Sequence, residues 1–110
     1  MPGYAVGRPV ERDTGDSWAL VAEIPSAEFD EVTLIVKNVH QTNSLDYRVT
    51  VLAYPGGVEY EEVPQTTLEP GKADKRLLTG RYYRVRVYAK NANAGAPSRV
   101  RVEWIAGGRR

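Results

Sequence analysis

The side chains that most often carry out chemistry are sparse in this sequence and stand in poor contexts for it. His40 is the only histidine, and no serine lies in the G-x-S-x-G pattern that exposes a nucleophile. A histidine in this loop is expected to hydrogen-bond to the backbone. The acidic segments EYEE (59–62) and DTGD (13–16) fit an exposed edge strand and a turn better than the closely spaced oxygens of a calcium site. We therefore predict no catalytic residue, no metal and no cofactor, and hence not an enzyme.

Arginine and tyrosine form the most regular polar pattern in the chain. Arginines occupy alternate positions in RYYRVRVYAK (81–90) and again in RVRVEWIA (99–106). If these two segments form a hairpin, their outward side chains gather on one face, because successive strand residues point to opposite sides. The predicted partner-binding residues on this face are Tyr82, Arg84, Arg86, Tyr88, Arg99 and Arg101.

Such a face needs acidic neighbours, because like charges opposite one another destabilise a strand pair. Glu59, Glu61 or Glu103 could supply them within the chain, or solvent could screen the charges. A second interpretation is an acidic partner protein, since arginine and tyrosine are enriched at interface centres. A nucleic acid is disfavoured by the net charge of only +1, from 15 basic and 14 acidic residues.

The two tryptophans offer a different chemistry, because an exposed indole face can stack on a sugar ring. That arrangement would make the chain a carbohydrate-binding or adhesive module. Trp104, however, continues the inward phase of Val100 and Val102, and Trp18 shares its phase with the apolar positions that follow it. Both tryptophans are therefore predicted to fill the core.

The backbone that must position these side chains is predicted to be all-β. From Ser17 onward apolar residues recur at about every second position, the period of a half-buried strand, and no helical period is sustained. About seven short strands between turn residues predict an antiparallel β-sandwich, with a small barrel as the alternative. The predicted strand segments are 17–24, 31–39, 46–54, 58–63 (ended by Pro64), 66–78 (with a Pro-Gly turn at 70–71), 81–90 and 99–106.

Composition limits the class of protein further. A chain of 110 residues, 42% of them hydrophobic, suits one domain with one core. The absence of cysteine excludes disulfides and thiolate metal sites. No apolar run approaches the roughly 18 residues of a membrane span, and the N-terminus lacks the apolar segment of a secretory signal. We expect folding in a reducing cytoplasm and no membrane partner.

The first 15 residues, MPGYAVGRPVERDTG, have no sustained apolar period and predict an extended arm. The chain is thus divided into an arm (1–15), a sandwich domain (16–107) and a polar tail (108–110). Ordering the arm costs about 1–2 kcal/mol per residue, so we expect a partner surface or a neighbouring copy to order it, with packing of the arm on its own domain as the alternative. The arm residues predicted to bind that partner are Tyr4, Val6, Arg8, Val10 and Arg12.

Three segments, VTLIVKNVHQTNSLDYRVTVLAY, TTLEPGKADKRLL and YYRVRVYAKN, resemble immunoglobulin-like and fibronectin-III-like sandwiches across residues 17–106. A strand ending in KN, an L-x-P-G turn and a Y-x-V-x-V strand carry this likeness, although the cysteine pair of antibody domains is absent.

A small, cysteine-free sandwich with a terminal arm also resembles accessory virion proteins of tailed bacteriophages, such as capsid decoration and tail-associated subunits. The resemblance implies a non-enzymatic virion subunit, made in the host cytoplasm, that binds major capsid protein or other assembly subunits and forms a homo-oligomer.

Overall fold

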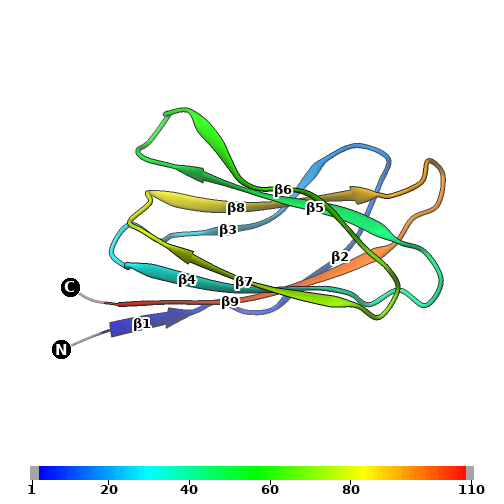
Figure 1. Cartoon of the computed structure of the whole chain (residues 1–110), viewed down its shortest axis with the longest axis horizontal. Helices are drawn as coiled ribbons and strands as arrows, with labels where there is room; N and C mark the ends of the chain where they lie inside the picture. Colours follow the sequence, from blue (N-terminus) through cyan, green and yellow to red (C-terminus); the bar gives the residue numbers. More distant parts are fainter. Residues whose placement is uncertain (1–2, 109–110) are drawn as a thin grey trace.

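The computed structural model describes residues 3–108, which form nine strands in two antiparallel sheets packed face to face (Figure 1). The five-stranded sheet has the order β1-β9-β4-β7, with β2 also paired to β9, and the four-stranded sheet has the order β3-β8-β5-β6. The two sheets together confirm the predicted all-β antiparallel sandwich. Their bounds are β1 (Gly3–Val6), β2 (Val10–Asp13), β3 (Ala19–Ile24), β4 (Glu31–Asn38), β5 (Leu45–Leu52), β6 (Glu59–Leu68), β7 (Ala73–Thr79), β8 (Arg84–Asn91) and β9 (Arg99–Gly108).

The strand pairing follows a nested pattern. β5 pairs with β6, β4 with β7, β3 with β8 and β2 with β9, as in one long ribbon whose tip is the β5–β6 hairpin. Rolling the ribbon joins β4 to β9 and β5 to β8, which produces the two sheets. This order is that of a jelly roll.

The likeness to immunoglobulin-type domains therefore holds only for two packed antiparallel sheets. Those domains place several consecutive strands side by side. Among the strands described here, β5 and β6 are the one pair that is both consecutive and hydrogen-bonded.

Strict alternation builds the core between the sheets. Val32, Leu34 and Val36 of β4 are at most 1% exposed. The buried alternate valines of β9 lie beside them in the same sheet, and those of β8 belong to the opposite sheet. Tyr47 of β5 is fully buried, and its hydroxyl donates to Asp74 at 2.7 Å and accepts from Arg76 Nε at 2.9 Å, at the side where β7 closes the sandwich. Burial raises the pKa of Tyr47 to about 12.

The prediction that Pro64 ends a strand is wrong, because β6 runs through it to Leu68. β6 lies at the edge of its sheet, where a residue without an N–H is tolerated. Its pairing with β5 shifts register on both sides of Val49, opposite this part of β6.

The hairpin of 81–90 with 99–106, on which the single arginine face depended, does not form, because β8 and β9 lie in different sheets. β8 pairs with β3 and β5, while β9 pairs with β4 and with the two N-terminal strands. The alternation identified correctly which side chains of β8 and β9 point outward, but Tyr82, which precedes β8, packs against the core. It carries no information about which strands are neighbours, so Arg84 and Arg86 lie on one broad face of the molecule and Arg99 and Arg101 on the other.

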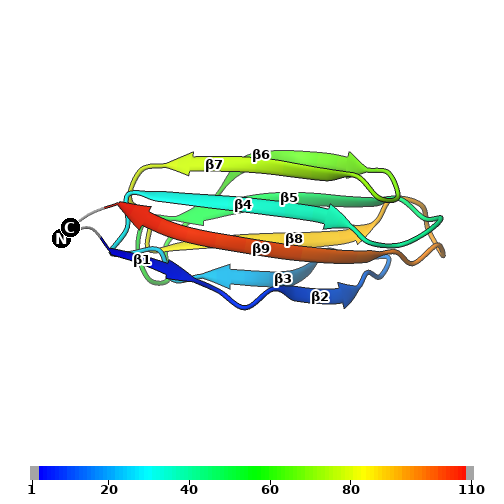
Figure 2. The same ribbon diagram turned by 90° about the horizontal axis from the view of Figure 1, so that it is seen from below.

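The N-terminal segment is extended, as predicted, but it belongs to the five-stranded sheet of its own chain. β1 and β2 follow one another along the free edge of β9 (Figure 2). The expectation that a partner is required to order this segment is therefore corrected, since backbone pairing with β9 supplies the contacts. The division of the chain into units stays a prediction, and residues 1–2 and 109–110 lie outside the described residues.

Candidate protein-binding surface

Aliphatic side chains gather on the outer face of the five-stranded sheet, the face turned toward the viewer in Figure 2. Strand register aligns one row across it: Val6 opposite Ile105, Ile105 opposite Thr33, and Thr33 opposite Leu77. Val6 is 63% exposed, Leu77 56% and Ile105 43%. Single exposed apolar residues are ordinary, but a contiguous group marks a contact site. We call this group the apolar face and define it as Tyr4, Val6, Ile35, Leu77 and Ile105.

A groove opens beside the apolar face, where the N-terminal segment leaves β9. β1 and β2 both pair with β9, but residues 7–9 between them do not continue the ladder. The groove has a volume of about 340 Å³. It is lined by Val6, Gly7, Pro9, Thr33, Ile35, Glu103, Trp104 and Ile105.

The indole of Trp104 fills the gap between β1 and β2 and forms one wall of the groove. Trp104 packs against the core, as its inward phase predicted, and stands opposite Leu34 in the register. Gly7 lies so close to this ring that a Cβ there would be 2.1 Å from Trp104 Nε1. Position 7 therefore accepts only glycine while the indole keeps this place.

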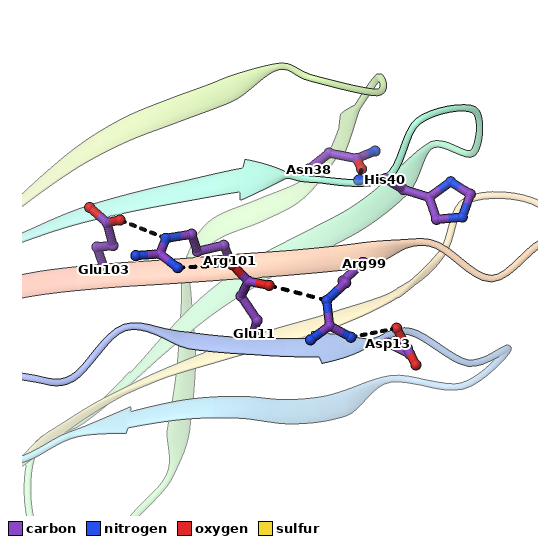
Figure 3. Close-up of polar contacts among 7 residues, drawn as sticks. All are labelled: Glu11, Asp13, Asn38, His40, Arg99, Arg101 and Glu103. Carbon is purple, nitrogen blue, oxygen red and sulfur yellow. Dashed lines mark hydrogen bonds and ion pairs between the residues drawn. The ribbon is translucent and has the colours of Figure 1, made fainter.

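Ion pairs fasten β2 to β9 on the same outer face (Figure 3). Arg101 donates to Glu11 at 2.8 Å and to Glu103 at 2.7 Å, and Arg99 donates to Glu11 at 3.1 Å and to Asp13 at 2.8 Å. The hydrogen bonds from Arg101 and then Arg99 lower the pKa of Glu11. Of the predicted acidic neighbours only Glu103 bonds to these two arginines, and the other two partners, Glu11 and Asp13, come from the N-terminal segment.

A polar cluster holds the end of the molecule where this segment enters β3. The buried Thr14 accepts from the backbone N–H of Ser98 at 2.8 Å and donates to Asn91, whose amide donates to Asp16 at 2.8 Å. A backbone hydrogen bond from Gly95, and then the bond from Asn91, lower the pKa of Asp16.

Beside this cluster, His40 makes the backbone contacts predicted for it. Its Nδ1 accepts from the N–H groups of Thr42 at 3.2 Å and Asn43 at 3.0 Å. The backbone N–H of His40 donates to the side-chain oxygen of the buried Asn38 at 2.9 Å (Figure 3).

The outer face of the four-stranded sheet is polar, and its charges have partners within the chain. Arg86 of β8 donates to Glu23 at 2.8 Å and to Glu59 at 2.9 Å. Glu59 also accepts from the hydroxyls of Tyr88 and Thr50. The hydrogen bond from Tyr88 lowers the pKa of Glu59, and the bonds that Arg86 donates to Glu23 and Glu59 raise the pKa of Arg86.

Trp18 lies on this polar face, so its predicted place in the core is wrong. The register of β3 shifts between Leu20 and Ala22, which moves the residues before the shift to the outer side. The guanidinium of Arg48 lies 5.0 Å from the ring centres of both Trp18 and Tyr88, and Lys90 lies 5.3 Å from that of Trp18. These cations cover ring surface that a stacked sugar would need.

Comparisons with known proteins concern the fold. No family model matches the chain, and no curated protein matches it. Solved structures do resemble it: PirA aligns with a TM-score of 0.64 and 12% identity over 87% of this chain and 92% of that one. The SPBc2 prophage-derived protein YomS aligns with a TM-score of 0.63 and 9% identity over 98% and 96%. The VP2 subviral particle protein of infectious bursal disease virus aligns with 0.56 and 8% over 97% of this chain and 31% of VP2.

The structure separates the eleven predicted partner-binding residues rather than bringing them together. Tyr4 and Val6 belong to the apolar face. Val10 and Tyr82 pack against the core, and Arg12 donates to the carbonyl of Leu20 at 2.8 Å. Arg8 is exposed beside the groove, and Arg84 stacks on Tyr83 at 4.1 Å. The remaining four, Arg86, Tyr88, Arg99 and Arg101, make the hydrogen bonds described above.

Sequence analysis missed Ile35, Leu77, Trp104 and Ile105 as members of a contact surface. A signal was available for two of them, since Ile35 and Ile105 stand in the outward phase of their strands among polar residues. Leu77 precedes the buried Leu78. Two adjacent leucines do not show which of them points outward, and only the pairing with β4 settles it.

Within residues 3–108, no three His, Cys, Asp or Glu side chains stand close enough together to hold a metal ion. In the same part of the chain, no helix is long and apolar enough to cross a membrane.

Proposed function

We propose that this protein is a non-enzymatic structural subunit of a protein assembly and that it contacts a neighbouring protein through the apolar face. The observation that carries the proposal is the row of exposed aliphatic side chains beside a groove, on a domain whose other broad face has its charges paired internally. Removing such a patch from water is worth about 25 cal/mol per Å² of apolar surface.

The kind of assembly is proposed from fold likeness. Similar folds occur in a prophage-derived protein and in the protein of a viral subviral particle. We extend this to a virion-type role, such as an accessory subunit attached to a capsid. Binding of that kind stabilises an assembled shell by mass action, without a chemical step.

A decisive experiment examines particles purified from the phage, virus or cell that encodes the chain. After density-gradient sedimentation, mass spectrometry should find the chain with the particles in a fixed ratio to the major subunit. Ile105→Lys should move it to the soluble fraction. Val58→Lys is the matched control, because Val58 is 86% exposed and lies in the β5–β6 connection, away from the apolar face. A wild-type chain found only in the soluble fraction would contradict the proposal.

The carbohydrate-binding alternative predicts free ring faces at Tyr82 or Tyr88. Tyr82 packs against the core and donates to the carbonyl of Thr79 at 3.1 Å, while Tyr88 lies against Arg48. Neither arrangement favours that alternative.

A further inference from the structure

We infer that the free edge of β1 pairs with the same edge of a second copy of this chain, so that the five-stranded sheets of two copies join into one antiparallel sheet about a two-fold axis at Ala5. The inference goes beyond the proposed function, which concerns the outer face of this sheet and not its edge. It follows from a comparison of the edge strands and from the direction in which the backbone groups of β1 point.

β1 differs from the other described edge strands in having neither a charged residue nor a proline. Edge strands present unpaired backbone groups, and charges, prolines and bulges are the usual means of preventing another chain from pairing with them. β2 and β7 contain three charged residues each, β6 contains three glutamates and Pro64, and β3 contains Glu23 and a register shift. The sequence of β1, GYAV, has none of these protections.

The backbone of β1 presents two residues to this open edge. In an antiparallel ladder, residues bonded to the neighbouring strand alternate with residues whose N–H and C=O groups face the other side. Gly7 donates to the carbonyl of Trp104 at 3.4 Å, so Ala5, two residues earlier, also faces β9. The N–H and C=O groups of Tyr4 and Val6 therefore point away from β9, and no other described strand lies beyond them in the sheet.

A two-fold axis perpendicular to the sheet at Ala5 satisfies these groups. It places Ala5 opposite Ala5 of the other copy, and Tyr4 of each copy opposite Val6 of the other. Tyr4 and Val6 then exchange both backbone hydrogen bonds, as opposed residues of an antiparallel pair do. Their side chains, 72% and 63% exposed in one copy, lie on the same face and form two aromatic–β-branched pairs, which stabilise a ladder.

A second copy suits this edge because both sides of the contact are the same uncharged strand. No charges of β1 are brought together, and the net charge of +1 places little repulsion between two copies. A strand that pairs with itself about a two-fold axis also meets the requirement of an isologous interface.

The position of β1 leaves room for the second copy. Figure 2 shows β1 at one end of the sheet edge, beside the end of β9. Rotation about Ala5 therefore carries the body of the second copy beyond that end, so the β2 strands of the two copies stay apart. Because the axis is perpendicular to the sheet, the apolar faces of both copies lie on the same side of the joined sheet.

The first test traps the contact with a disulfide. The chain has no cysteine, so an Ala5→Cys variant can form a disulfide only between copies. Residues opposed in a non-hydrogen-bonded pair have Cα atoms about 4.5 Å apart, which a disulfide can span. Under mild oxidation at about 100 μM we expect mostly linked dimer. Val58→Cys is the control, because its side chain is 86% exposed but lies away from this edge. Circular dichroism establishes that both variants remain folded, and equal dimer yields overturn the inference.

The second test uses the unmodified chain. By the same alternation, the amides of Glu11 and Asp13 on β2 also face the open edge but are not predicted to pair. As the protein concentration rises toward about 1 mM, hydrogen exchange measured by NMR should slow at least threefold at Tyr4 and Val6 and stay unchanged at Glu11 and Asp13. Exchange at Tyr4 and Val6 that does not depend on concentration overturns the inference.

A third test blocks the edge without loosening β1. Tyr4→Pro removes an N–H that faces the second copy and leaves the hydrogen bonds to β9, and edge strands tolerate such a proline. In the Ala5→Cys background it should lower the yield of linked dimer at least tenfold. Tyr4→Phe keeps the N–H and the ring, so its yield should match that of Ala5→Cys alone. Equal yields from the proline and phenylalanine variants would show that the copies do not meet through this edge.

The outcomes also separate the inference from the proposed function. Copies that link through Ala5→Cys but are absent from every particle keep the edge pairing and remove the structural role. A chain that co-sediments with particles, but whose Ala5→Cys variant links no better than the control, keeps that role and removes the edge pairing.

Discussion

The two broad faces of this sandwich are built on the same core but present opposite chemistry. On the four-stranded sheet, Arg86 donates to both Glu23 and Glu59, and Arg48 lies between two aromatic rings. On the five-stranded sheet, ion pairs gather where β2 joins β9, and exposed aliphatic side chains lie on the remainder together with Thr33, Lys37 and Lys75. The polar face pairs most of its charges within the chain, although Arg48 Nε is buried without a hydrogen-bond partner, whereas the apolar face keeps its aliphatic surface in water.

The difference shows why regular charge is a poor guide to a binding surface. Strands with alternating arginines were predicted to bind a partner because their pattern is regular, yet most of these arginines pair with acidic residues of the same chain. Exposed ion pairs contribute only about 0–1 kcal/mol each, so they organise the surface more than they stabilise it. An uncovered aliphatic row has no intramolecular use of this kind.

The largest expected difference between the faces comes from exchanging each tryptophan for alanine. Trp104→Ala removes the indole that fills the gap between β1 and β2, and we expect a loss of about 3 kcal/mol in the free energy of unfolding. Trp18→Ala removes cation–π contacts on the polar face and should cost about 1 kcal/mol. Urea unfolding measures both. Equal losses would mean that the two rings are buried alike, contrary to the described contacts.

A second prediction concerns the groove itself. Gly7→Ala places a Cβ where the indole of Trp104 lies, so the ring or the N-terminal segment must move. We expect a loss of about 1–3 kcal/mol, as for other overpacked positions, together with faster amide exchange in β1. Gly3→Ala is the matched control, because a Cβ at Gly3 meets no atom within 4 Å. Similar stability of the two variants would show that the indole does not occupy the gap.

The contribution of the polar face to the free energy of unfolding should decrease in acid. The pKa of Glu59 is lowered from its ordinary value of 4.5, first by the Tyr88 hydroxyl, so its contribution is complete above that value and is lost as the pH falls through the lower folded pKa. Glu59→Gln should cost about 1 kcal/mol at neutral pH and less in acid. The comparison variant is Glu62→Gln, which changes an exposed carboxylate that has no ion pair with the described residues. Chemical unfolding of wild type and both variants at several pH values measures these losses. Parallel pH profiles of the free energy of unfolding for wild type and Glu59→Gln would contradict the lowered pKa of Glu59.

Sequence alone predicted the fold class and most strands, because alternation is a local property of each segment. The outward positions of β4, β8 and β9 followed from it directly. Sheet membership did not follow, because the jelly-roll order is set by which edges meet when the ribbon rolls, and this depends on residues far apart in the chain. The phase of Trp18 was lost to one register shift at Leu20, and a shift of one residue exchanges the two faces of a strand.

The candidate site was predictable only in part, for the same reason. Tyr4 and Val6 were recognised as contact residues because they are apolar residues within a polar segment. Their neighbours Ile35, Leu77 and Ile105 come from three other strands, and only the register of β1, β9, β4 and β7 brings them together. The arginine–tyrosine face failed because its two halves belong to different sheets.

The smallest effect on stability is expected within the apolar face, and it provides the sharpest contrast. Ile35→Thr alters a side chain that is 39% exposed, and we expect the free energy of unfolding of the monomer to change by less than about 0.5 kcal/mol. Its neighbour Leu34 is fully buried, and Leu34→Ala should cost about 2–5 kcal/mol.

Unfolding must be measured at low protein concentration, because association stabilises the folded state by mass action. A loss for Ile35→Thr as large as that for Leu34→Ala would place this side chain in the structural core, and the apolar face would no longer be a surface awaiting a partner.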